Sequence, residues 1–286
     1  MSYKIKSLAK DAWPPLLAEI NDPPKQLWYA GEIPDYSRKL LCVVGSRKFT
    51  QYGKDATEYL IEGLRGYPIT IVSGLALGID SIAHRAAMKN NLPTIAVPGS
   101  GLEPKALHPQ SHVRLAEEIV EKGGTLLNEF VPDFKATHYS FPLRNRIMAG
   151  MCSATLIIEA EEKSGTLITA KLTSEYNREL LALPGSIFSR STTGPHMFLR
   201  LGATLVRNSN DILETLGIKV EDEKKVNDYS DCSENEMRII EFLREPKEKD
   251  EIFSNSGLPA GEVQTILTLL SLKGHIKETL GEVRLN

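Results

Sequence analysis

The ten residues from Phe141 to Gly150 combine side-chain types that bind nucleic acid. They read Phe-Pro-Leu-Arg-Asn-Arg-Ile-Met-Ala-Gly, so an aromatic ring, two guanidinium groups and a carboxamide stand within six residues. An aromatic ring can stack on a base, arginine can form paired hydrogen bonds to a phosphate, and asparagine can bond a base edge or a sugar. A packed core has little use for this mixture. The segment therefore predicts contact with nucleic acid.

Helix geometry separates the two arginines of this segment. If Pro142 occupies the first turn of a helix, Phe141, Arg144 and Asn145 lie on neighbouring faces. At about 100° per residue, Arg146 points about 200° away from Arg144. We expect Arg144 to contact the ligand, and Arg146 to contact the ligand or to form a structural ion pair. The plainer alternative is that Phe141 packs in the core and both arginines are solvated.

Three glycine-bearing turns offer further contacts. Gly45-Ser46-Arg47 supplies a small residue, a hydroxyl and a guanidinium, which suit a phosphate, although a tight turn with a solvated arginine would look the same. The turn from Ser73 to Asp80, with Gly74, can hold an anion on its amides unless Asp80 satisfies them itself. Pro98-Gly99-Ser100-Gly101 could be a phosphate loop but is interpreted as an ordinary turn.

A further cation is a candidate for phosphate contact, and the common catalytic motifs are absent from the sequence. Lys171 lies about one turn into a predicted helix and can reach a phosphate, or it is simply exposed. The chain contains no G-x-S-x-G, H-E-x-x-H or C-x-x-C motif. His108 and His112 are expected at the surface. The sequence therefore predicts neither a catalytic centre, a cofactor nor a metal site.

These residues follow a rhythm of short apolar strands and helices of ordinary length. Continuous apolar strands that alternate with helices are typical of a mainly parallel sheet covered on both faces, whose ligands bind beyond the carboxyl ends of the strands. The predicted strands are Leu40–Val44, Ile69–Val72, Thr94–Val97, Thr125–Leu127, Thr155–Glu159, Leu180–Leu183 and a possible edge strand Ala203–Val206. The predicted helices between them include Lys54–Arg65, Ile79–Lys89, Ser111–Glu121 and Leu167–Arg178.

The rhythm divides the chain into four parts. Residues 1–38 are expected to be an irregular extension, with one short strand at Leu27-Trp28-Tyr29, that packs on the main domain of residues 39–216. Residues 217–231 are acidic, lack apolar periodicity and are interpreted as a linker. Residues 232–286 contain three helical patterns and a hairpin turning at Leu280-Gly281, which indicates a small winged-helix domain.

Composition and charge are those of an ordinary globular protein. The 286 residues are 41% hydrophobic and 25% charged, with a net charge of −3. Much of the acid lies between Lys219 and Glu251, so a local basic pocket elsewhere remains compatible with the total. Cys42, Cys152 and Cys232 are isolated, which fits a reducing cytoplasm. No apolar run approaches the ~18 residues of a membrane span.

Five motifs in order resemble the DNA-processing protein A (DprA/Smf) family of bacteria. They are the Gly45-Ser46-Arg47 turn, the turn from Ser73 to Asp80, Ala96 to Gly101, Phe141 to Ile147, and Gly165 to Ala170. The resemblance runs through residues ~14–215 and extends to the winged-helix domain that many members carry. It implies an extended Rossmann-like, doubly wound fold and a homodimer. It also implies single-stranded DNA binding, protection of incoming strands and loading of the RecA recombinase during natural transformation.

Carried over by motif, the resemblance implies a DNA pocket rather than an active site. The motifs supply six of the predicted DNA-binding residues, and the side-chain chemistry described above adds Ser46 and Arg146. The full set is Ser46, Arg47, Gly74, Phe141, Arg144, Asn145, Arg146 and Lys171.

Two other functions compete with this interpretation. The sheet and glycine turns also resemble nucleoside-monophosphate phosphoribohydrolases, but the Pro-Gly-Gly-x-Gly-Thr-x-x-Glu loop of those enzymes is incomplete here. A duplex-binding regulator could act through the winged helix. Its expected recognition helix, Glu262–Leu272, has no Lys or Arg before Lys273, which is poor for reading a major groove.

Overall fold

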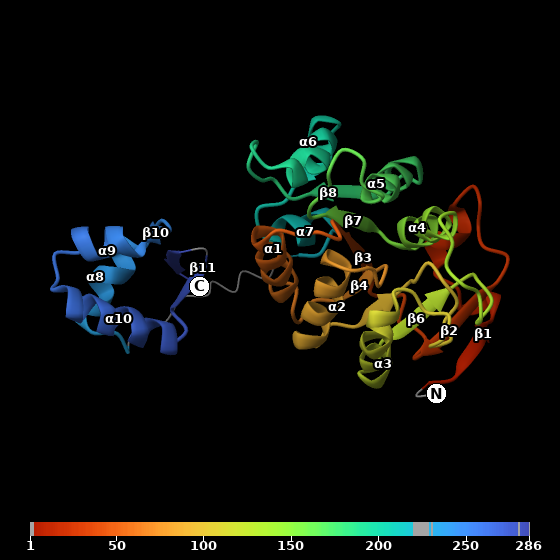
Figure 1. The fold of residues 1–286 in the computed structure, drawn as a ribbon, viewed down its shortest axis with the longest axis horizontal. Coiled ribbons are helices and arrows are strands. Elements are labelled where there is room, and N and C mark those ends of the chain that lie inside the picture. The colour runs from red at the N-terminus through yellow and green to blue at the C-terminus, as the bar shows by residue number, and fades with distance from the viewer. Residues whose placement is uncertain (1–2, 220–228, 230, 280, 286) are drawn as a thin grey trace. The chain divides into compact units, whose positions relative to one another are not determined.

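The computed structural model describes residues 3–219, 229, 231–279 and 281–285. The chain divides into two compact units, Met1–Val220 and Glu221–Asn286, and each is described by itself (Figure 1). Most of the predicted acidic linker, residues 217–231, lies outside the described residues. No helix among the residues that are described is long and apolar enough to cross a bilayer.

A nine-stranded sheet organises the larger unit. Its strands follow the order β1-β2-β6-β5-β4-β3-β7-β8-β9, and every pair from β6 to β9 is parallel. The mainly parallel, doubly wound sheet predicted from the sequence is confirmed. The parallel strands are β3 Lys39–Val44, β4 Ile69–Ser73, β5 Thr94–Ala96, β6 Thr125–Asn128, β7 Ala154–Ile157, β8 Glu179–Ala182 and β9 Thr204–Leu205. The chain order reverses between β3 and β7, so this is the switch point of the sheet.

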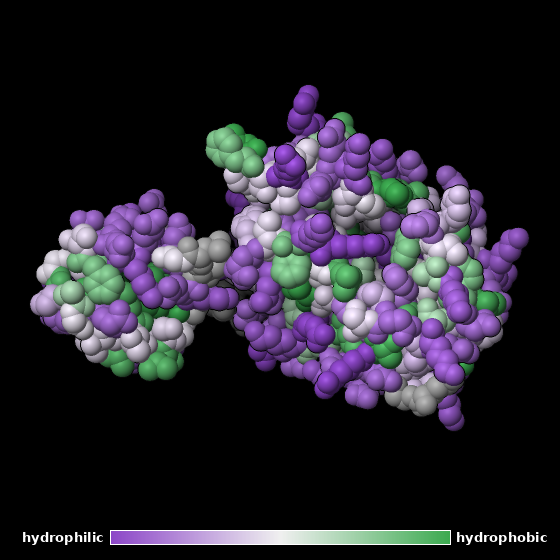
Figure 2. Space-filling view, in the orientation of Figure 1, coloured by the Kyte–Doolittle hydropathy of each residue, from purple (hydrophilic) through white to green (hydrophobic). Residues whose placement is uncertain are grey.

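Helices cover both faces because side chains alternate along each strand. Cys42 and Val44 of β3 belong to an apolar cluster with α4 (Ser140–Met151), α5 (Thr166–Glu175) and α6 (Thr193–Arg200). Leu41 and Val43 belong to the opposite cluster with α1 (Gln51–Glu62), α2 (Ile79–Lys89) and α7 (Ser209–Thr215). The helix α3 (Val113–Glu121) packs beside β5 and β6, and the surface seen in Figure 2 is mostly hydrophilic. Short 3-10 turns precede α3 (Gln110–His112) and α6 (Arg190–Thr192).

The N-terminal extension adds two antiparallel strands to the sheet. The strands β1 (Ile5–Leu8) and β2 (Leu27–Gly31) pair with each other, and β2 pairs with β6. Two 3-10 turns, Lys10–Ala12 and Pro15–Glu19, lie between them. The sequence predicted only the second strand. In β1 only Leu8 is buried, so its pattern lacks the alternation that marks a strand.

A buried histidine joins α2 to the sheet. The Nδ1 atom of His84 lies 2.8 Å from Thr94 Oγ1, and that hydroxyl donates to the carbonyl of Ile71. The histidine must therefore donate from Nδ1, and it is neutral. Burial lowers the pKa of His84 to about 3, and the electrostatic effects of His112 and Arg144 lower it further.

Acid should destabilise the protein through His84. The pKa of this imidazole is lower in the folded chain than its ordinary value of 6.5. The unfolded chain therefore binds the proton first, and stability is lost as pH falls from 6.5 towards 3, by about 1.4 kcal/mol per pH unit. Urea titrations of wild type and His84→Gln from pH 8 to 4.5 should show the variant less stable at pH 8 and the gap closing at low pH. Parallel pH profiles would contradict this role.

The C-terminal unit is a small three-helix domain with a three-stranded sheet. Its elements are α8 Glu234–Phe242, β10 Lys247–Glu248, α9 Lys249–Asn255, α10 Ala260–Leu272, β11 Ile276–Thr279 and β12 Glu282–Leu285. Ser233 and Glu236 form a capping box at the start of α8. An apolar cluster of its own, including Ile240, Leu267 and Val283, holds the unit together. The strands β11 and β12 pair as the predicted hairpin, and Leu280 of its turn lies outside the described residues.

Candidate nucleic-acid interface

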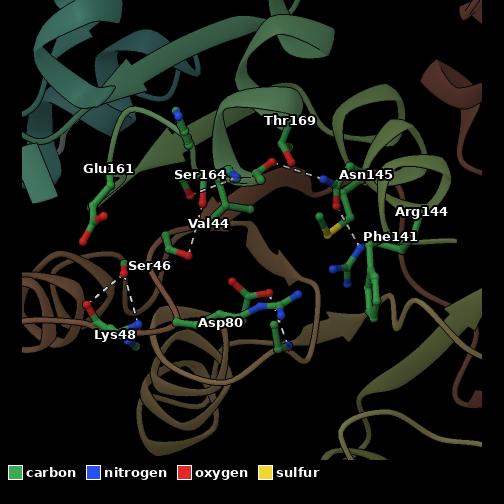
Figure 3. Close-up of a pocket in the computed structure, with 17 residues that line it drawn as sticks. Val44, Ser46, Lys48, Asp80, Phe141, Arg144, Asn145, Glu161, Ser164 and Thr169 are labelled. Carbon is green, nitrogen blue, oxygen red and sulfur yellow. Dashed lines mark hydrogen bonds between the residues drawn. The ribbon is translucent and has the colours of Figure 1, made fainter. Parts of the chain in front are cut away.

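A cavity of about 560 Å³ opens at the carboxyl ends of β3 and β7, at the switch point of the sheet. Figure 3 shows Phe141 and Arg144 on one side of it and Ser46 and Lys48 on the other. The lining residues come from the loop after β3, the turn before α2, α4, and the segment from β7 into α5. They are Val44, Gly45, Ser46, Arg47, Lys48, Ala76, Asp80, Phe141, Arg144, Asn145, Met148, Glu161, Lys163, Ser164, Gly165, Thr166 and Thr169.

Phe141 stands in the first turn of α4 with one side packed against a glycine. A Cβ atom added to Gly99 would lie 2.5 Å from Cδ1 of the ring, so only glycine permits this approach. His108 packs at a ring-centroid distance of 5.6 Å, and the Arg47 guanidinium lies 5.4 Å from the ring centroid. The ring is half-buried and lines the cavity. It is held in place yet keeps surface for stacking.

Free cations lie around the cavity. Arg47, Lys48 and Lys163 line it, are exposed, and carry no side-chain hydrogen bond or ion pair within the described part of the chain. Ser46 fixes the turn that holds two of them, because its hydroxyl donates to Lys48 O and accepts from Lys48 N. Charges with no hydrogen-bonded or ion-pair partner among the described residues are available to phosphate.

Arg144 has a different role from Arg47. Its guanidinium is buried, donates from Nη1 to the carbonyls of Gly74 and Val97, and donates from Nε to Asn145 Oδ1 at 3.0 Å. Burial lowers the pKa of Arg144, while the Asp80 carboxylate opposes that change. Most of its donors are therefore already used, so it ties α4 to the ends of β4 and β5 at the floor of the cavity.

Asp80 occupies the anion position that the sequence allowed for a phosphate. Its Oδ2 accepts from the amides of Gly74 at 3.1 Å and Ala76 at 3.3 Å. Burial raises the pKa of Asp80, and the Arg144 charge and the two amides lower it. Of the two alternatives from the sequence, the structure therefore contains the one in which Asp80 itself bonds the amides of the turn. Gly74 lines a smaller adjoining cavity that shares Arg47, Phe141 and Arg144.

Asn145 links α4 to the start of α5. Its Oδ1 faces the Arg144 Nε donor, and its Nδ2 donates to the carbonyl of Gly165 at 3.4 Å (Figure 3). Thr166 in turn donates from its hydroxyl to Gly45 O at 3.2 Å. These bonds hold the two sides of the cavity together.

Two predicted site residues lie away from the cavity. Arg146 points to the N-terminal extension, donates to Asp22 O at 2.7 Å and pairs with Glu129, which is the structural alternative left open by the sequence. Lys171 is exposed in a separate groove beside α6. It stands two residues after Thr169, about 200° around α5, so a lysine there faces away from the cavity.

Sequence reasoning missed several lining residues. Lys48 and Lys163 belong to no motif, and only their position after a strand or beside the Gly165 turn could have indicated them. Thr169 belongs to the motif from Gly165 to Ala170 but was not predicted as a site residue. His112, which was expected at the surface, is buried, and its Nδ1 lies 2.8 Å from the Leu75 carbonyl. Glu159, at the end of the predicted strand Thr155–Glu159, is buried and accepts from Thr50 and Ser191.

One group of possible metal ligands lies in the C-terminal unit. Asp231, Cys232 and His275 bring one oxygen, one sulfur and one nitrogen within 4.8 Å of one another. The ammonium of Lys273 lies 3.7 Å from the other carboxylate oxygen of Asp231.

Comparisons with known proteins agree on one family. The family model for DNA recombination-mediator protein A matches residues 4–217. Protein Smf of Escherichia coli is 38% identical over 277 residues, which cover 94% of this chain and 74% of that protein. DNA processing protein DprA of Streptococcus pneumoniae is 38% identical over 207 residues, which cover 72% of each.

Two solved structures share the fold of the larger unit. The X-ray structure of DprA from Streptococcus pneumoniae gives a TM-score of 0.70 at 37% identity and covers 76% of each chain. DNA processing protein A from Helicobacter pylori, whose structure was described for its single-stranded DNA binding mode, gives a TM-score of 0.66 at 28% identity. It covers 75% of this chain and 96% of that one. The chain therefore belongs to the DNA recombination-mediator protein A family.

Proposed function

We propose that this chain binds single-stranded DNA in the cavity at the switch point and acts as a recombination mediator. In this role it protects incoming strands and loads the RecA recombinase onto them during natural transformation, in the cytoplasm and without catalysing a reaction. The pairing of Phe141 with Arg47 carries the proposal. A ring with surface for stacking, 5.4 Å from a guanidinium that has no ion pair among the described residues, suits a base and its neighbouring phosphate.

The cavity favours a single strand over a duplex. A base can reach the Phe141 ring only when it is unstacked, and the bases of a duplex are already stacked and paired. Arg47, Lys48 and Lys163 lie around the cavity. There they can contact the phosphates of a DNA strand that has a base inside the cavity. The relative from Helicobacter pylori, whose structure was described for its single-stranded DNA binding mode, supports the same assignment.

Fluorescence anisotropy with a labelled oligo-dT, free and then in duplex, tests this proposal. We expect the single strand to bind at least about 10-fold more tightly. Its affinity should fall with salt at a slope of about −0.7 per phosphate contact. Equal affinity for both forms, or no dependence on salt, would contradict the assignment.

Recombinase loading needs its own assay. RecA filaments form slowly on DNA already covered by a single-strand-binding protein. We expect wild type to shorten the lag in RecA-dependent ATP hydrolysis on such DNA, and Phe141→Ala not to do so. An unchanged lag with wild-type protein that binds DNA would restrict the function to protection.

A homodimer is supported by apolar side chains at the free end of the sheet. Leu201 is 75% exposed and Leu205 45% exposed, on the segment from α6 into the edge strand β9. Exposed apolar groups at an unpaired edge suit a second copy of the chain. We expect Leu201→Glu combined with Leu205→Glu to give monomers in light scattering. The control Leu272→Glu, at an 80% exposed leucine of the C-terminal unit, should leave the dimer intact. A monomeric wild type would remove this part of the proposal.

The alternative of a nucleoside-monophosphate hydrolase has a direct assay. Glu161 lines the cavity without a partner among the described residues, and a carboxylate there is what that chemistry would need. Asp80 is already held by backbone amides. Incubation with each nucleoside monophosphate should release no free base. Release that depends on Glu161 would establish the enzyme.

A further inference from the structure

We propose that Asp231, Cys232 and His275 form a zinc-binding site. A bound ion would fasten the β11–β12 hairpin of the C-terminal unit to the segment before α8. The proposal concerns a unit that takes no part in the DNA cavity as described. The three residues come from two places far apart in sequence, Asp231 and Cys232 just ahead of α8 and His275 just ahead of β11. No disulfide engages the thiol, because Cys232 is free.

The spacing of the donor atoms fits a tetrahedral ion. The Cys232 Sγ lies 3.6 Å from Asp231 Oδ1, and His275 Nε2 lies 3.1 Å from the same oxygen. Zinc bonds of about 2.3 Å to sulfur and 2.0–2.2 Å to nitrogen and oxygen give tetrahedral edges of about 3.6 Å for S···O and about 3.4 Å for N···O. The two edges that meet at Asp231 Oδ1 are within a few tenths of an ångström of these values, and Cys232 Sγ lies within 4.8 Å of His275 Nε2.

The donor set selects the metal. A thiolate with an imidazole suits zinc and other borderline ions, whereas magnesium and calcium prefer oxygen ligands alone. Asp231 is exposed and His275 is mostly covered, so the ion would enter from the Asp231 side. That open side leaves a fourth position for water.

Lys273 is the group that opposes a cation. Its ammonium lies 2.9 Å from Glu236 Oε1 and donates to the main-chain carbonyl of Asp231 at 2.8 Å, whereas its distance from Asp231 Oδ2 is 3.7 Å. Glu236 is its nearer carboxylate, and the Asp231 oxygen that faces Cys232 and His275 is the other one, Oδ1. The ammonium would lower the affinity of the site for a cation by Coulomb repulsion, but it does not occupy the position of the metal ion. We therefore expect Lys273→Gln to bind the metal more tightly than wild type.

A bound ion would connect the first and second halves of the unit. His275 also packs its ring edge-on against Tyr229, at a centroid distance of 5.2 Å. An ion that binds only the folded unit stabilises it in proportion to the logarithm of the metal concentration. Zinc should therefore raise the melting temperature of the C-terminal unit and leave that of the larger unit unchanged.

Titration of the full-length reduced protein with Co²⁺, followed by displacement with Zn²⁺, tests the site. We expect one equivalent of Co²⁺ to give the intense visible bands of a tetrahedral ion and a near-ultraviolet band from a thiolate ligand. Cys232→Ser should abolish the thiolate band, and Cys232→Ser and His275→Gln should each weaken binding by at least about 10-fold. His138→Gln, at an exposed histidine of the larger unit, is the control and should bind as wild type does.

Three outcomes would overturn the proposal. The first is a wild-type protein that gives no tetrahedral spectrum in excess Co²⁺. The second is a spectrum that persists in Cys232→Ser. The third is a Kd that is equally weak in wild type and in both ligand variants, which would indicate scattered surface binding. Circular dichroism of each variant confirms that a lost spectrum reflects a lost ligand rather than an unfolded unit.

Discussion

Gly74→Ala should damage both DNA binding and stability. An added Cβ atom would lie 2.0 Å from Nη1 of Arg144 and 2.5 Å from its Cζ, so the guanidinium must leave the carbonyls of Gly74 and Val97. Such overpacking costs about 1–3 kcal/mol. Because the same contacts anchor the helix that carries Phe141, we expect affinity for oligo-dT to fall by at least about 10-fold. Urea titration and anisotropy measure the two effects.

A double-mutant cycle isolates the cause of this damage. If the clash with Arg144 is responsible, Gly74→Ala should cost little further stability in an Arg144→Ala background, because the colliding group is gone. Gly261→Ala is the matched control. A Cβ atom there would meet nothing within 4 Å, so its effect on stability and binding should be small. Equal costs of Gly74→Ala in both backgrounds would show that Arg144 is not the group displaced.

Arg47→Ala should have the largest effect on DNA binding with little effect on stability. Arg47 is exposed and lacks a hydrogen-bonded partner in the described chain, so its loss leaves no buried group unsatisfied. A hydrogen bond to a charged group contributes about 1.5–3 kcal/mol, which corresponds to a loss of about 10- to 100-fold in affinity. The salt slope should become shallower by about 0.7, because one phosphate contact is lost.

Lys171→Ala is the matched control for Arg47→Ala. It removes an equal charge from an exposed position of the same unit, but in a groove separate from the cavity. We expect its affinity for oligo-dT to stay within about 3-fold of wild type, since a distant exposed charge is screened. If Lys171→Ala and Arg47→Ala weakened binding equally, the DNA would be held by overall charge rather than by this cavity.

The sequence predicted the frame of the cavity because that frame depends on local patterns. Apolar runs fixed the parallel strands, and the glycine turns that follow them had to lie at one edge of the sheet. Gly45, Arg47, Phe141 and Asn145 meet there as expected. Helix periodicity alone also places Arg144 and Arg146 on different faces of α4.

The remainder depended on contacts between distant segments. Whether Arg144 faced a ligand or the carbonyls of Gly74 and Val97 could not be told from α4 alone. The same holds for Asp80, whose carboxylate meets the amides of its own turn. The strand β1 was missed because only its pairing with β2 defines it. The position of Lys171 outside the cavity could not be told either, because the face of α5 that borders the cavity is set by packing on α4.

Photocrosslinking would test most directly whether DNA enters this cavity. An oligo-dT with one 4-thiothymidine is bound to the full-length protein, irradiated and digested, and the modified peptides are identified by mass spectrometry. Adducts are expected on the peptides that contain Phe141 or Arg47, and they should be lost when unlabelled oligo-dT competes. Adducts confined to residues 232–286, or an adduct pattern that is the same in Phe141→Ala as in wild type, would place the DNA elsewhere and contradict binding in this cavity.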